Sequence, residues 1–453
     1  MKKYIALIAL IIFSLLLVSC GSCNDKEHEH EYKEVRVITE ATCYSLGERV
    51  VECKCDSSFI EEIGYKQHAY ENGKCTVCGA TESLTYKKYE DAGDYYVVTG
   101  YKGNDTEVVV PKQHEGLLVL KIADGVFREK SIKKITLPDS LREIGESAFL
   151  NCSELEEVNL PSSLESLGNG AFKGCIKLKE AKLEGTKLKK IEPYAFSGCD
   201  SIGEICLSEG ITEIGHSAFE GTSSLKEVTL PSTLTKIGEY AFDAYVERVT
   251  IAGTRSWCNI EFANNLSSPL NGGLASLYIG GEIVKSVAIP EEITEIKSFA
   301  FYRCNGIEEV TIGNNVKKIG TNAFTFCKRL KKVSIADSVV EIGEGAFLQC
   351  VALEEINIPK NITVIPDYML KGCISLKELE IPESVIEIKT HGIAYCTSLN
   401  EIYIGKQIVN IGQYAFLGCD KLTIKCEASE PNENWHAEWN ASNRPTVYSV
   451  KKD

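Results

Sequence analysis

The feature that most constrains this chain of 453 residues is a repeat that begins near Asp124. An apolar anchor residue recurs every 22 to 24 residues, with one longer interval of 59 residues. Repeats of this length are supersecondary units that bury their apolar faces by stacking, so the pattern predicts a solenoid. The anchors are Phe127, Phe149, Phe172, Phe196, Phe219, Phe242, Phe301, Phe324, Phe347, Leu370, Ile393 and Phe416.

Each repeat has the same internal order. It opens with alternating apolar and polar residues, as from Leu155 to Leu160, which predicts a short half-buried strand. Pro161 follows and ends the strand, because proline has no N–H for the ladder. Gly168 is expected to turn the chain, and Ala171-Phe172 to close the unit around its interior. Stacked copies would then pair their strands in parallel, about 4.7–4.9 Å apart.

The full pattern, Leu-x-x-Val-x-Leu-Pro-x-x-Leu-x-x-Ile-Gly-x-x-Ala-Phe-x-x-Cys, resembles the BspA-like class of leucine-rich repeats over roughly residues 95–425. That resemblance implies an α/β-poor solenoid of about 23-residue units with a parallel concave sheet. It also implies an adhesin-like bacterial surface protein, without catalysis, that binds host or neighbouring-cell macromolecules such as extracellular proteins or glycoproteins. The alternative is a non-binding envelope scaffold or spacer.

The N-terminus has the pattern of a secretion signal. Residues 1–19 combine a basic start with a short apolar run, which is typical of a signal peptide. The run ends in Leu17-Val18-Ser19-Cys20, which resembles the processing box of bacterial lipoproteins. This resemblance implies that Cys20 is lipidated and that residues 20–27 tether the chain to the membrane at the cell surface. A plain cleaved signal is the alternative.

Residues 28–82 form a separate module that is rich in cysteine and histidine. Two half-copies lead from His30 to Cys53-x-Cys55 and from His68 to Cys75-x-x-Cys78-Gly79. Paired cysteines at this separation match the spacing of structural zinc ligands, which predicts a site made of Cys53, Cys55, Cys75 and Cys78. Cys43 and the two histidines are alternative ligands, and disulfides could staple so small a module instead.

Nine further cysteines each lie three residues after an anchor. Because free cysteine packs as a small apolar group, and stacked neighbours point the same way, we expect buried free thiols rather than disulfides. These residues are Cys152, Cys175, Cys199, Cys304, Cys327, Cys350, Cys373, Cys396 and Cys419.

The solenoid is expected to span residues 86–425, with an interruption over 243–290. A Gly280-Gly281 pair between apolar runs predicts a hairpin. The rest of the interruption is either a loop over the convex side or a ligand-binding insertion around Trp257. Tyr95–Thr99 and Val108–Val110 are expected to pair as a starting hairpin, and residues 426–453 to form a cap. In that cap Trp435 and Trp439 would cover the last repeat, or stack on a carbohydrate.

Charge and motif content narrow the function. The net charge of −15 disfavours nucleic acid as a partner. The sequence has no His-Glu-x-x-His, phosphate loop or Gly-x-Ser-x-Gly elbow, and no catalytic residues are predicted. The histidines of the array are expected to be too scattered to converge on one pocket; they are His114, His216, His391 and His436.

One outward-facing position of the predicted strands is mostly acidic. In strand order it holds Glu157, Glu180, Glu204, Glu227, Arg248, Glu309, Lys332, Glu355, Glu378 and Glu401. Neighbouring lysines such as Lys179, Lys226, Lys331 and Lys377 could simply screen this row. Alternatively the row attracts a basic partner, with the binding residues predicted in the second half of the array: Glu355, Glu378, Glu380, Glu401 and Tyr403.

Overall fold

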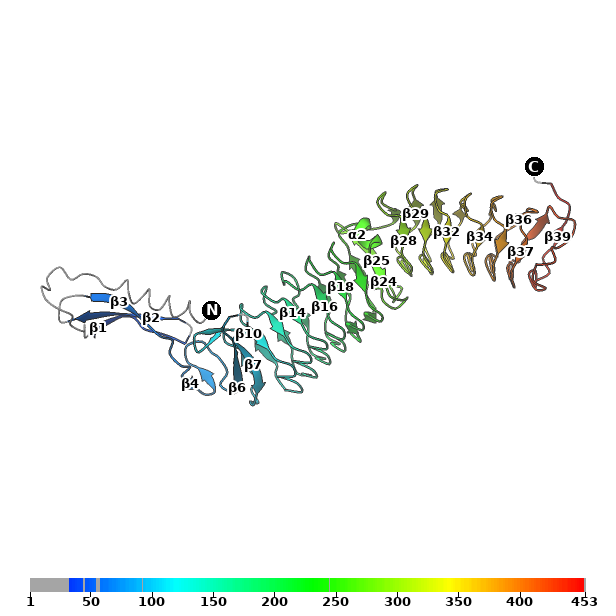
Figure 1. Ribbon diagram of the computed structural model, residues 1–453. Coiled ribbons are helices and arrows are strands. Elements are labelled where there is room, and N and C mark those ends of the chain that lie inside the picture. Colours follow the sequence, from blue (N-terminus) through cyan, green and yellow to red (C-terminus); the bar gives the residue numbers. More distant parts are fainter. Residues whose placement is uncertain (1–31, 44, 54–57, 92, 244, 452–453) are drawn as a thin grey trace. The chain divides into compact units, whose positions relative to one another are not determined.

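The structure is a computed structural model that describes residues 32–451 except 44, 54–57, 92 and 244 (Figure 1). The predicted signal peptide at 1–19, Cys20, the tether and Cys55 lie outside the described residues. The chain divides into two compact units. Unit 1 comprises the chain up to Glu82 together with Pro111–Leu118, and unit 2 comprises Ser83–Val110 and the chain from Val119 onward.

Unit 1 is a small antiparallel structure. Its sheet has the order β1 (Tyr32–Thr39), β2 (Gly47–Cys53) and β3 (Ser58–Ile63). A second hairpin pairs β4 (Tyr70–Glu71) with β5 (Lys74–Cys75), and β9 (Gln113–His114) pairs with the start of β10 (Leu117–Ile122). All eight residues of β1 are exposed, so this sheet encloses little apolar core.

Unit 2 is a β-solenoid in which each turn contributes to two rows of short parallel strands. The first strand row consists of β8 (Glu107–Val109), β11 (Lys134–Thr136), β13 (Glu157–Val158), β15 (Glu180–Ala181), β17 (Glu204–Cys206), β20 (Glu227–Thr229), β23 (Arg248–Thr250), β25 (Ser276–Ile279), β27 (Ser286–Ala288), β29 (Glu309–Ile312), β31 (Lys332–Ile335), β33 (Glu355–Ile356), β36 (Glu401–Ile404), β38 (Thr423–Cys426) and β39 (Thr446–Val447). The second strand row consists of β7 (Tyr95–Tyr101), β10, β12 (Glu143–Ile144), β14 (Ser166–Leu167), β16 (Lys190–Ile191), β18 (Glu213–Ile214), β21 (Lys236–Ile237), β24 (Glu261–Phe262), β28 (Glu295–Ile296), β30 (Lys318–Ile319), β32 (Glu341–Ile342), β34 (Val364–Ile365), β35 (Glu387–Ile388) and β37 (Asn410–Ile411).

Helix is nearly absent from the described chain, as the sequence predicts. The described chain contains the short helix α2 (Thr254–Cys258). Apart from the two strand rows, β19 (Phe219–Glu220) pairs in parallel with β22 (Phe242–Asp243). No helix within the described residues is long and apolar enough to cross a bilayer.

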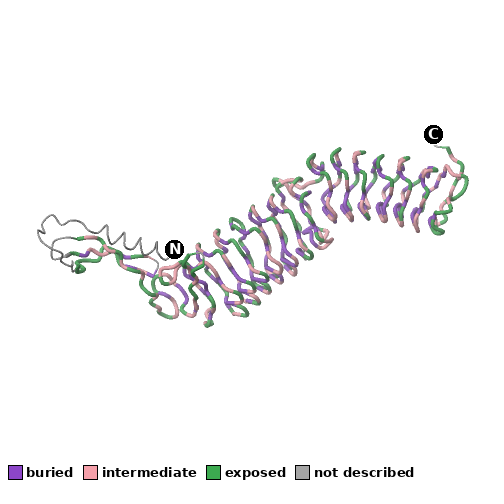
Figure 2. The backbone as a smooth tube through the Cα atoms, viewed as in Figure 1, coloured by how far each residue is buried: buried purple, intermediate pink, exposed green. Residues whose placement is uncertain are grey.

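The core runs through the solenoid because buried and exposed residues alternate along the turns (Figure 2), as they do in β29 and β31. The anchor phenylalanines are fully buried, and successive rings stack from Phe127 to Phe242 and again from Phe301 to Phe347. Phe149 and Phe172 have ring centroids 4.8 Å apart at 1°, and Phe324 and Phe347 lie 5.4 Å apart at 3°. Rings in such offset stacks gain about 0.5–1.5 kcal/mol beyond their area burial. The predicted anchors therefore form the core column of each half of the array.

Backbone hydrogen-bonding groups of one turn find their partners in the next turn. The anchor N–H donates to the carbonyl of the alanine one repeat later, from Phe149 to Ala171 at 2.7 Å and from Phe172 to Ala195 at 2.8 Å. Buried backbone groups must be paired, so this ladder fixes the register between turns. The repeat glycine has a related role: a Cβ at Gly343 would collide with the backbone of Thr321, one turn earlier. Gly343 thus allows close stacking rather than an unusual turn.

The cysteine column consists of buried, unbridged thiols in this structure, which confirms the prediction. Eight of the nine thiols make a specific hydrogen bond that the sequence did not reveal. Cys350 Sγ donates to the carbonyl of Phe324 at 3.1 Å, and Cys175 Sγ donates to that of Phe149 at 3.2 Å. The same bond to the previous anchor is made by Cys152, Cys199, Cys327, Cys373, Cys396 and Cys419. The column therefore satisfies buried carbonyls as well as filling space.

The predicted starting hairpin is wrong. The strands predicted to pair with each other belong to different rows: β7 pairs antiparallel with β6 (Leu84–Tyr89) and parallel with β10, whereas β8 pairs with β11. Alternation identifies a strand but does not say which neighbour it pairs with, and here the β6–β7 hairpin begins the solenoid.

The two tryptophans of the C-terminal segment pack against the last turns. Trp435 and Trp439 are each 8% exposed and pack edge-to-face at 4.9 Å. Trp439 lies against the last anchor, Phe416, at 6.0 Å, and Trp435 Nε1 donates to the carbonyl of Ile408 at 3.2 Å. Their burial leaves no open ring face for stacking on a carbohydrate.

The column thiols should resist modification in the native protein. Burial raises the pKa of Cys152 and of Cys304 to about 12, so neither thiol is ionised near neutral pH. Under native, non-reducing conditions iodoacetamide should leave the nine column thiols unmodified, and all nine should react after denaturation, as read by peptide mass spectrometry. Detection of a Cys350–Cys373 bridge in the unreduced protein would contradict this assignment.

Candidate functional site

Four potential metal ligands converge in unit 1. Their donor atoms all lie within 4.8 Å of one another, and the Cys/His cluster that they form consists of Cys43, His68, Cys75 and Cys78. Cys43 Sγ and Cys75 Sγ are 3.7 Å apart, and Cys78 Sγ lies 3.3 Å from His68 Nδ1. Cys43 and Cys75 are buried, whereas the other two residues are half-buried. Such a cluster could bind a metal ion.

A tight hairpin presents the two cysteines of the Cys-x-x-Cys-Gly motif. The turn between β4 and β5 is Asn72-Gly73, with φ of 51° and 74°, the conformation that this dipeptide favours between antiparallel strands. After Cys75 the chain folds back, because Gly79 N–H donates to the carbonyl of Cys75 at 2.9 Å. Gly79 has a φ of 72°, which explains the glycine of the motif. The two thiols thus come from one tight turn.

Cys43 reaches the cluster from the loop between β1 and β2. Ser45 N–H donates to Thr42 Oγ1 at 2.9 Å and closes this loop. Lys66 N–H donates to the carbonyl of Thr42 at 3.0 Å, which joins the loop to the segment that carries His68. Backbone bonds therefore bring together residues that are 32 positions apart in sequence.

The electrostatic environment distinguishes the thiols. Burial raises the pKa of Cys43 to about 12, and hydrogen bonds with its two thiol neighbours add to that effect. At Cys75 burial also acts to raise the pKa, but hydrogen bonds from the backbone of Cys78 and Val77 outweigh it and lower the value to about 6. Thiolate is the form that ligates metal, so Cys75 is the thiol best prepared to do so.

The observed cluster differs in part from the predicted ligand set. Of the four cysteines predicted, Cys75 and Cys78 belong to the cluster. The backbone of Cys53 ends β2 opposite Tyr32, and Cys55 lies outside the described residues. The other two members, Cys43 and His68, are among the alternatives that the sequence offered. The sequence evidence that these two residues are ligands was weak, because neither belongs to a paired-cysteine motif.

The sequence led us to expect His114 to lie alone in the repeat array, but the structure places it near another histidine. It belongs to unit 1, where its ring stacks on that of His68 at 6.0 Å. Burial lowers the pKa of His114, which favours the neutral ring at this position. On its other flank His68 stacks on Tyr70 at 5.8 Å.

The predicted register of the acidic row is confirmed. Glu157 lies opposite Glu180, and Glu227 lies between Glu204 and Arg248. In the second half of the solenoid Lys332 lies between Glu309 and Glu355, and Glu378 forms a parallel bridge with Glu401. All of these side chains point away from the core, so they form a surface row, which Ser276 and Ser286 interrupt between Arg248 and Glu309.

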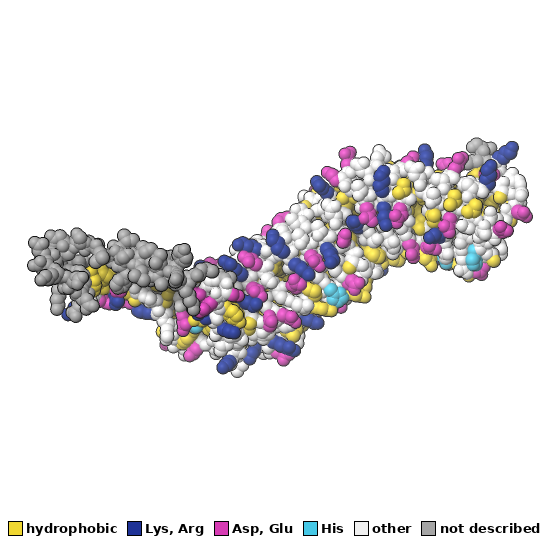
Figure 3. Space-filling view, in the orientation of Figure 1, with side chains coloured by type: hydrophobic (Ala, Val, Ile, Leu, Met, Phe, Trp, Pro, Cys, Tyr) yellow, Lys and Arg dark blue, Asp and Glu magenta, His cyan; other side chains and the backbone are white. Residues whose placement is uncertain are grey.

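The cations that neutralise this row are not those expected. The lysines predicted to screen it instead pair with the adjacent position: Lys179 with Glu156, Lys226 with Glu247, Lys331 with Glu308 and Lys377 with Glu354. The acidic row is paired by the strand residues Lys134, Arg248, Lys332 and Lys425, and by Lys182, which directly follows β15. Figure 3 shows the resulting mixture of both signs over the face that it draws.

The predicted binding residues lie close together on the outer side of the last strands. Glu355 forms an ion pair with Lys332 at 2.6 Å, and Glu401 forms one with Lys425 at 2.6 Å. Glu378 has no ion pair within 4.0 Å among the described residues. Glu380 is exposed, and half-buried Tyr403 donates its hydroxyl to the carbonyl of Val450 at 3.3 Å.

The interruption is an enlarged solenoid turn rather than a covering loop. Within it β24 pairs with β21, β25 pairs with β23, and β25 forms the predicted Gly280-Gly281 hairpin with β26 (Glu282–Ile283). Trp257 is fully buried, and its Nε1 donates to the carbonyl of Ala300 at 2.9 Å. The tryptophan therefore joins the two halves of the repeat array and cannot contact a ligand.

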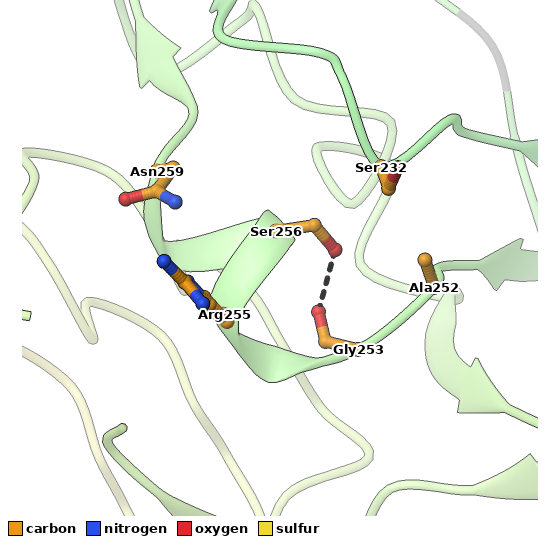
Figure 4. Close-up of a pocket in the computed structure, with 6 residues that line it drawn as sticks. All are labelled: Ser232, Ala252, Gly253, Arg255, Ser256 and Asn259. Carbon is orange, nitrogen blue, oxygen red and sulfur yellow. Dashed lines mark hydrogen bonds between the residues drawn. The ribbon is translucent and has the colours of Figure 1, made fainter. Parts of the chain in front are cut away.

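A shallow depression of about 340 Å³ lies beside α2 (Figure 4). Ser256 Oγ donates to the carbonyl of Gly253 at 2.8 Å, and Arg255 lies 3.6 Å from Glu292. The depression is lined by Ser232, Ala252, Gly253, Arg255, Ser256 and Asn259. Its polar groups are largely engaged with the protein itself, and no reactive constellation faces it.

The stacked turns, parallel strand rows and scarcity of helix define a leucine-rich-repeat β-solenoid. The chain belongs to the BspA-type leucine-rich repeat family, whose model matches six copies over residues 120–246 and 294–423, more than half of the chain. No curated protein matches the chain.

Solved structures of similar proteins come from bacteria. A leucine-rich repeat protein from Bacteroides ovatus is 27% identical, with a TM-score of 0.54 over 82% of this chain and 98% of that chain. A leucine rich cell surface protein from Faecalibacterium prausnitzii is 26% identical, with a TM-score of 0.48 over 86% and 99%. The pneumococcal vaccine antigen PcpA is 19% identical, with a TM-score of 0.39 over 92% and 99%.

Trp257 should contribute to stability at the junction of the two halves. Trp257→Phe retains most of the apolar volume but leaves the buried carbonyl of Ala300 without its donor, which should cost about 1–3 kcal/mol. Trp257→Ala should cost about 3–5 kcal/mol because it also opens a cavity. Urea denaturation followed by circular dichroism measures both losses. The exposed aromatic Tyr245, changed to Ala, is the control and should shift the midpoint little.

Proposed function

We propose that this protein is a cell-surface lipoprotein that binds an extracellular protein or glycoprotein, as an adhesin does, through the outer face of its first strand row. Solenoids of this kind present long, regular surfaces suited to macromolecules. The observation that carries the proposal is the acidic row, which runs in register from strand to strand with exposed side chains. We propose no catalytic role for the chain.

The second half of the array is the favoured contact region. Glu309 and Glu378 have no ion pair within 4.0 Å among the described residues, so their charges are available to a partner. Tyr403 adds an aromatic side chain beside Glu380 and Glu401, and aromatic residues are enriched at interface centres. A basic or mixed-charge partner fits such a surface, and its association would slow as salt rises.

A non-binding scaffold or spacer is the second candidate. It draws support from the ion pairs of Glu355 and Glu401, which remove much of the local acidity. A surface balanced within itself is what a spacer needs to avoid self-repulsion and non-specific capture.

Binding is tested with the chain from residue 21 to 453, prepared without lipid. It is passed over immobilised extracellular-matrix proteins, mucins and glycans in a surface plasmon resonance screen. Saturable binding to one class supports the adhesin-like function. A uniform lack of binding favours the scaffold.

The acidic row should control affinity for the partner found in that screen. Changing Glu355, Glu378 and Glu401 together to Gln removes three negative charges from the favoured half, so affinity should fall at least about tenfold and its salt dependence should flatten. The matched control changes Glu157, Glu180 and Glu204 to Gln, with the same charge difference in the same row of the first half. Equal effects of both triples would contradict the assignment to the second half.

Membrane anchoring through Cys20 is a further part of the proposal. The segment that ends in Leu17-Val18-Ser19-Cys20 supports lipidation at this cysteine. Two or more acyl chains give stable membrane binding, whereas one chain is marginal. In a bacterial host the native protein should enter the detergent phase of a Triton X-114 extract, and Cys20→Ser should move it to the aqueous phase. Retention of the variant in the detergent phase would contradict lipid anchoring at Cys20.

A further inference from the structure

We propose that the Cys/His cluster of unit 1 binds one structural zinc ion. This inference is independent of the proposed binding surface, since the cluster and the strand row belong to different units. It rests on geometry, donor chemistry and the small core of unit 1.

The donor atoms have the separations that tetrahedral zinc requires. With Zn–S near 2.3 Å and Zn–N near 2.0–2.1 Å, two sulfur ligands lie about 3.8 Å apart and a sulfur and a nitrogen about 3.6 Å apart. The distance between Cys43 Sγ and Cys75 Sγ is 3.7 Å, and that between Cys78 Sγ and His68 Nδ1 is 3.3 Å. A small adjustment of the histidine ring completes the tetrahedron.

The donor set selects the metal and its role. Three thiolates and one imidazole suit zinc and other soft or borderline metals, and they exclude magnesium and calcium, which prefer oxygen. Four protein ligands close the coordination sphere, which is the arrangement of structural rather than catalytic zinc. The site therefore cross-links the loop of Cys43 and the segment of His68 to the β4–β5 hairpin.

His68 is oriented as a ligand. Its ring lies between the rings of Tyr70 and His114, at 5.8 and 6.0 Å, and this stacking directs Nδ1 toward the thiols. Its Nε2 is buried without a hydrogen-bond partner in the described part of the chain. A metal at Nδ1 gives this buried ring a strong partner and fixes the proton on Nε2.

A disulfide accounts less well for the same residues. Three thiols converge, an odd number that a single bridge cannot use, and the histidine would have no role in it. The need for a cross-link is clear, because the apolar cluster of this region consists of Cys43, Cys75 and Ala80 with Tyr70 and Cys78 packed against it. So small a core requires a covalent or metal staple.

The first experiment measures metal in the chain of residues 21–453. Protein purified without added chelator should contain about one zinc ion per chain, as measured by inductively coupled plasma mass spectrometry. After replacement by Co²⁺ it should show thiolate-to-cobalt charge transfer and the visible bands of tetrahedral cobalt. Absence of metal, a different native metal, or a disulfide between any two cluster thiols in unreduced peptide maps would overturn the zinc assignment.

Variants then identify the ligands. Cys78→Ser and His68→Ala should each lower zinc occupancy at least about tenfold under competition with a chelator, since each removes a ligand. The matched control is the double variant Cys53→Ser/Cys55→Ser, which removes the other pair of module cysteines and should retain zinc. Loss of zinc in the control together with retention in His68→Ala would overturn this ligand set.

A substitution that retains four ligands distinguishes the loss of a ligand from misfolding of the module. His68→Cys should keep zinc, and its cobalt derivative should gain charge-transfer intensity from a fourth thiolate. An unchanged cobalt spectrum would show that position 68 does not ligate the metal. Chelation should also expose residues 58–82 to limited proteolysis while the solenoid remains resistant; equal sensitivity with and without chelator would contradict a structural role.

Discussion

The hydrogen-bonded stacking of one turn on the next is the constraint on which the rest of unit 2 depends. A single turn has inward residues on only a few positions, and its backbone groups point along the solenoid axis toward the neighbouring turns. The bond from the anchor N–H of Phe149 to the carbonyl of Ala171 recurs through the array, and the thiol of the cysteine column satisfies the anchor carbonyl. Both bonds require a fixed spacing between turns, which the small Ala and Gly residues allow.

That constraint explains why the irregular segments of unit 2 are so well packed. If the terminal turn were uncovered, or the interruption between the two halves were poorly packed, core rings would be exposed to water and backbone carbonyls would lack hydrogen-bond partners. Hence the three tryptophans lie at such places: Trp257 at the junction of the two halves, and Trp435 and Trp439 over the last turns. Large aromatic residues with an N–H donor can fill volume and satisfy a carbonyl together. Their positions at first sight suggest ligand binding, but their burial assigns them to the core.

The sequence predicts the solenoid well because its information is periodic. Anchor spacing gives the register, so Glu157 opposite Glu180 follows directly from a shift of one repeat. Interactions that do not follow the period are harder to foresee: the β6–β7 hairpin, the choice of Lys332 over Lys331 as partner of Glu355, and the approach of Cys43 to Cys75. Long side chains can reach several neighbours, and loop closure brings together residues whose sequence separation carries no signal. The sequence identified Cys43 and His68 as possible ligands, but it did not predict that they would converge with Cys75 and Cys78.

The cysteines of this chain illustrate how environment rather than residue type decides chemistry. In the solenoid the thiol of Cys152 donates to a buried backbone carbonyl within an apolar column, and burial raises its pKa to about 12, so it stays protonated. In unit 1 the backbone N–H groups of a tight turn face the sulfur of Cys75 instead and favour its thiolate. A thiol that donates can only complete a core, whereas thiolates that converge with an imidazole can hold a cation. The solenoid buries its apolar surface by repetition and needs no cross-link. Unit 1 has no repeat on which to stack, and the zinc site that we propose would supply the cross-link instead.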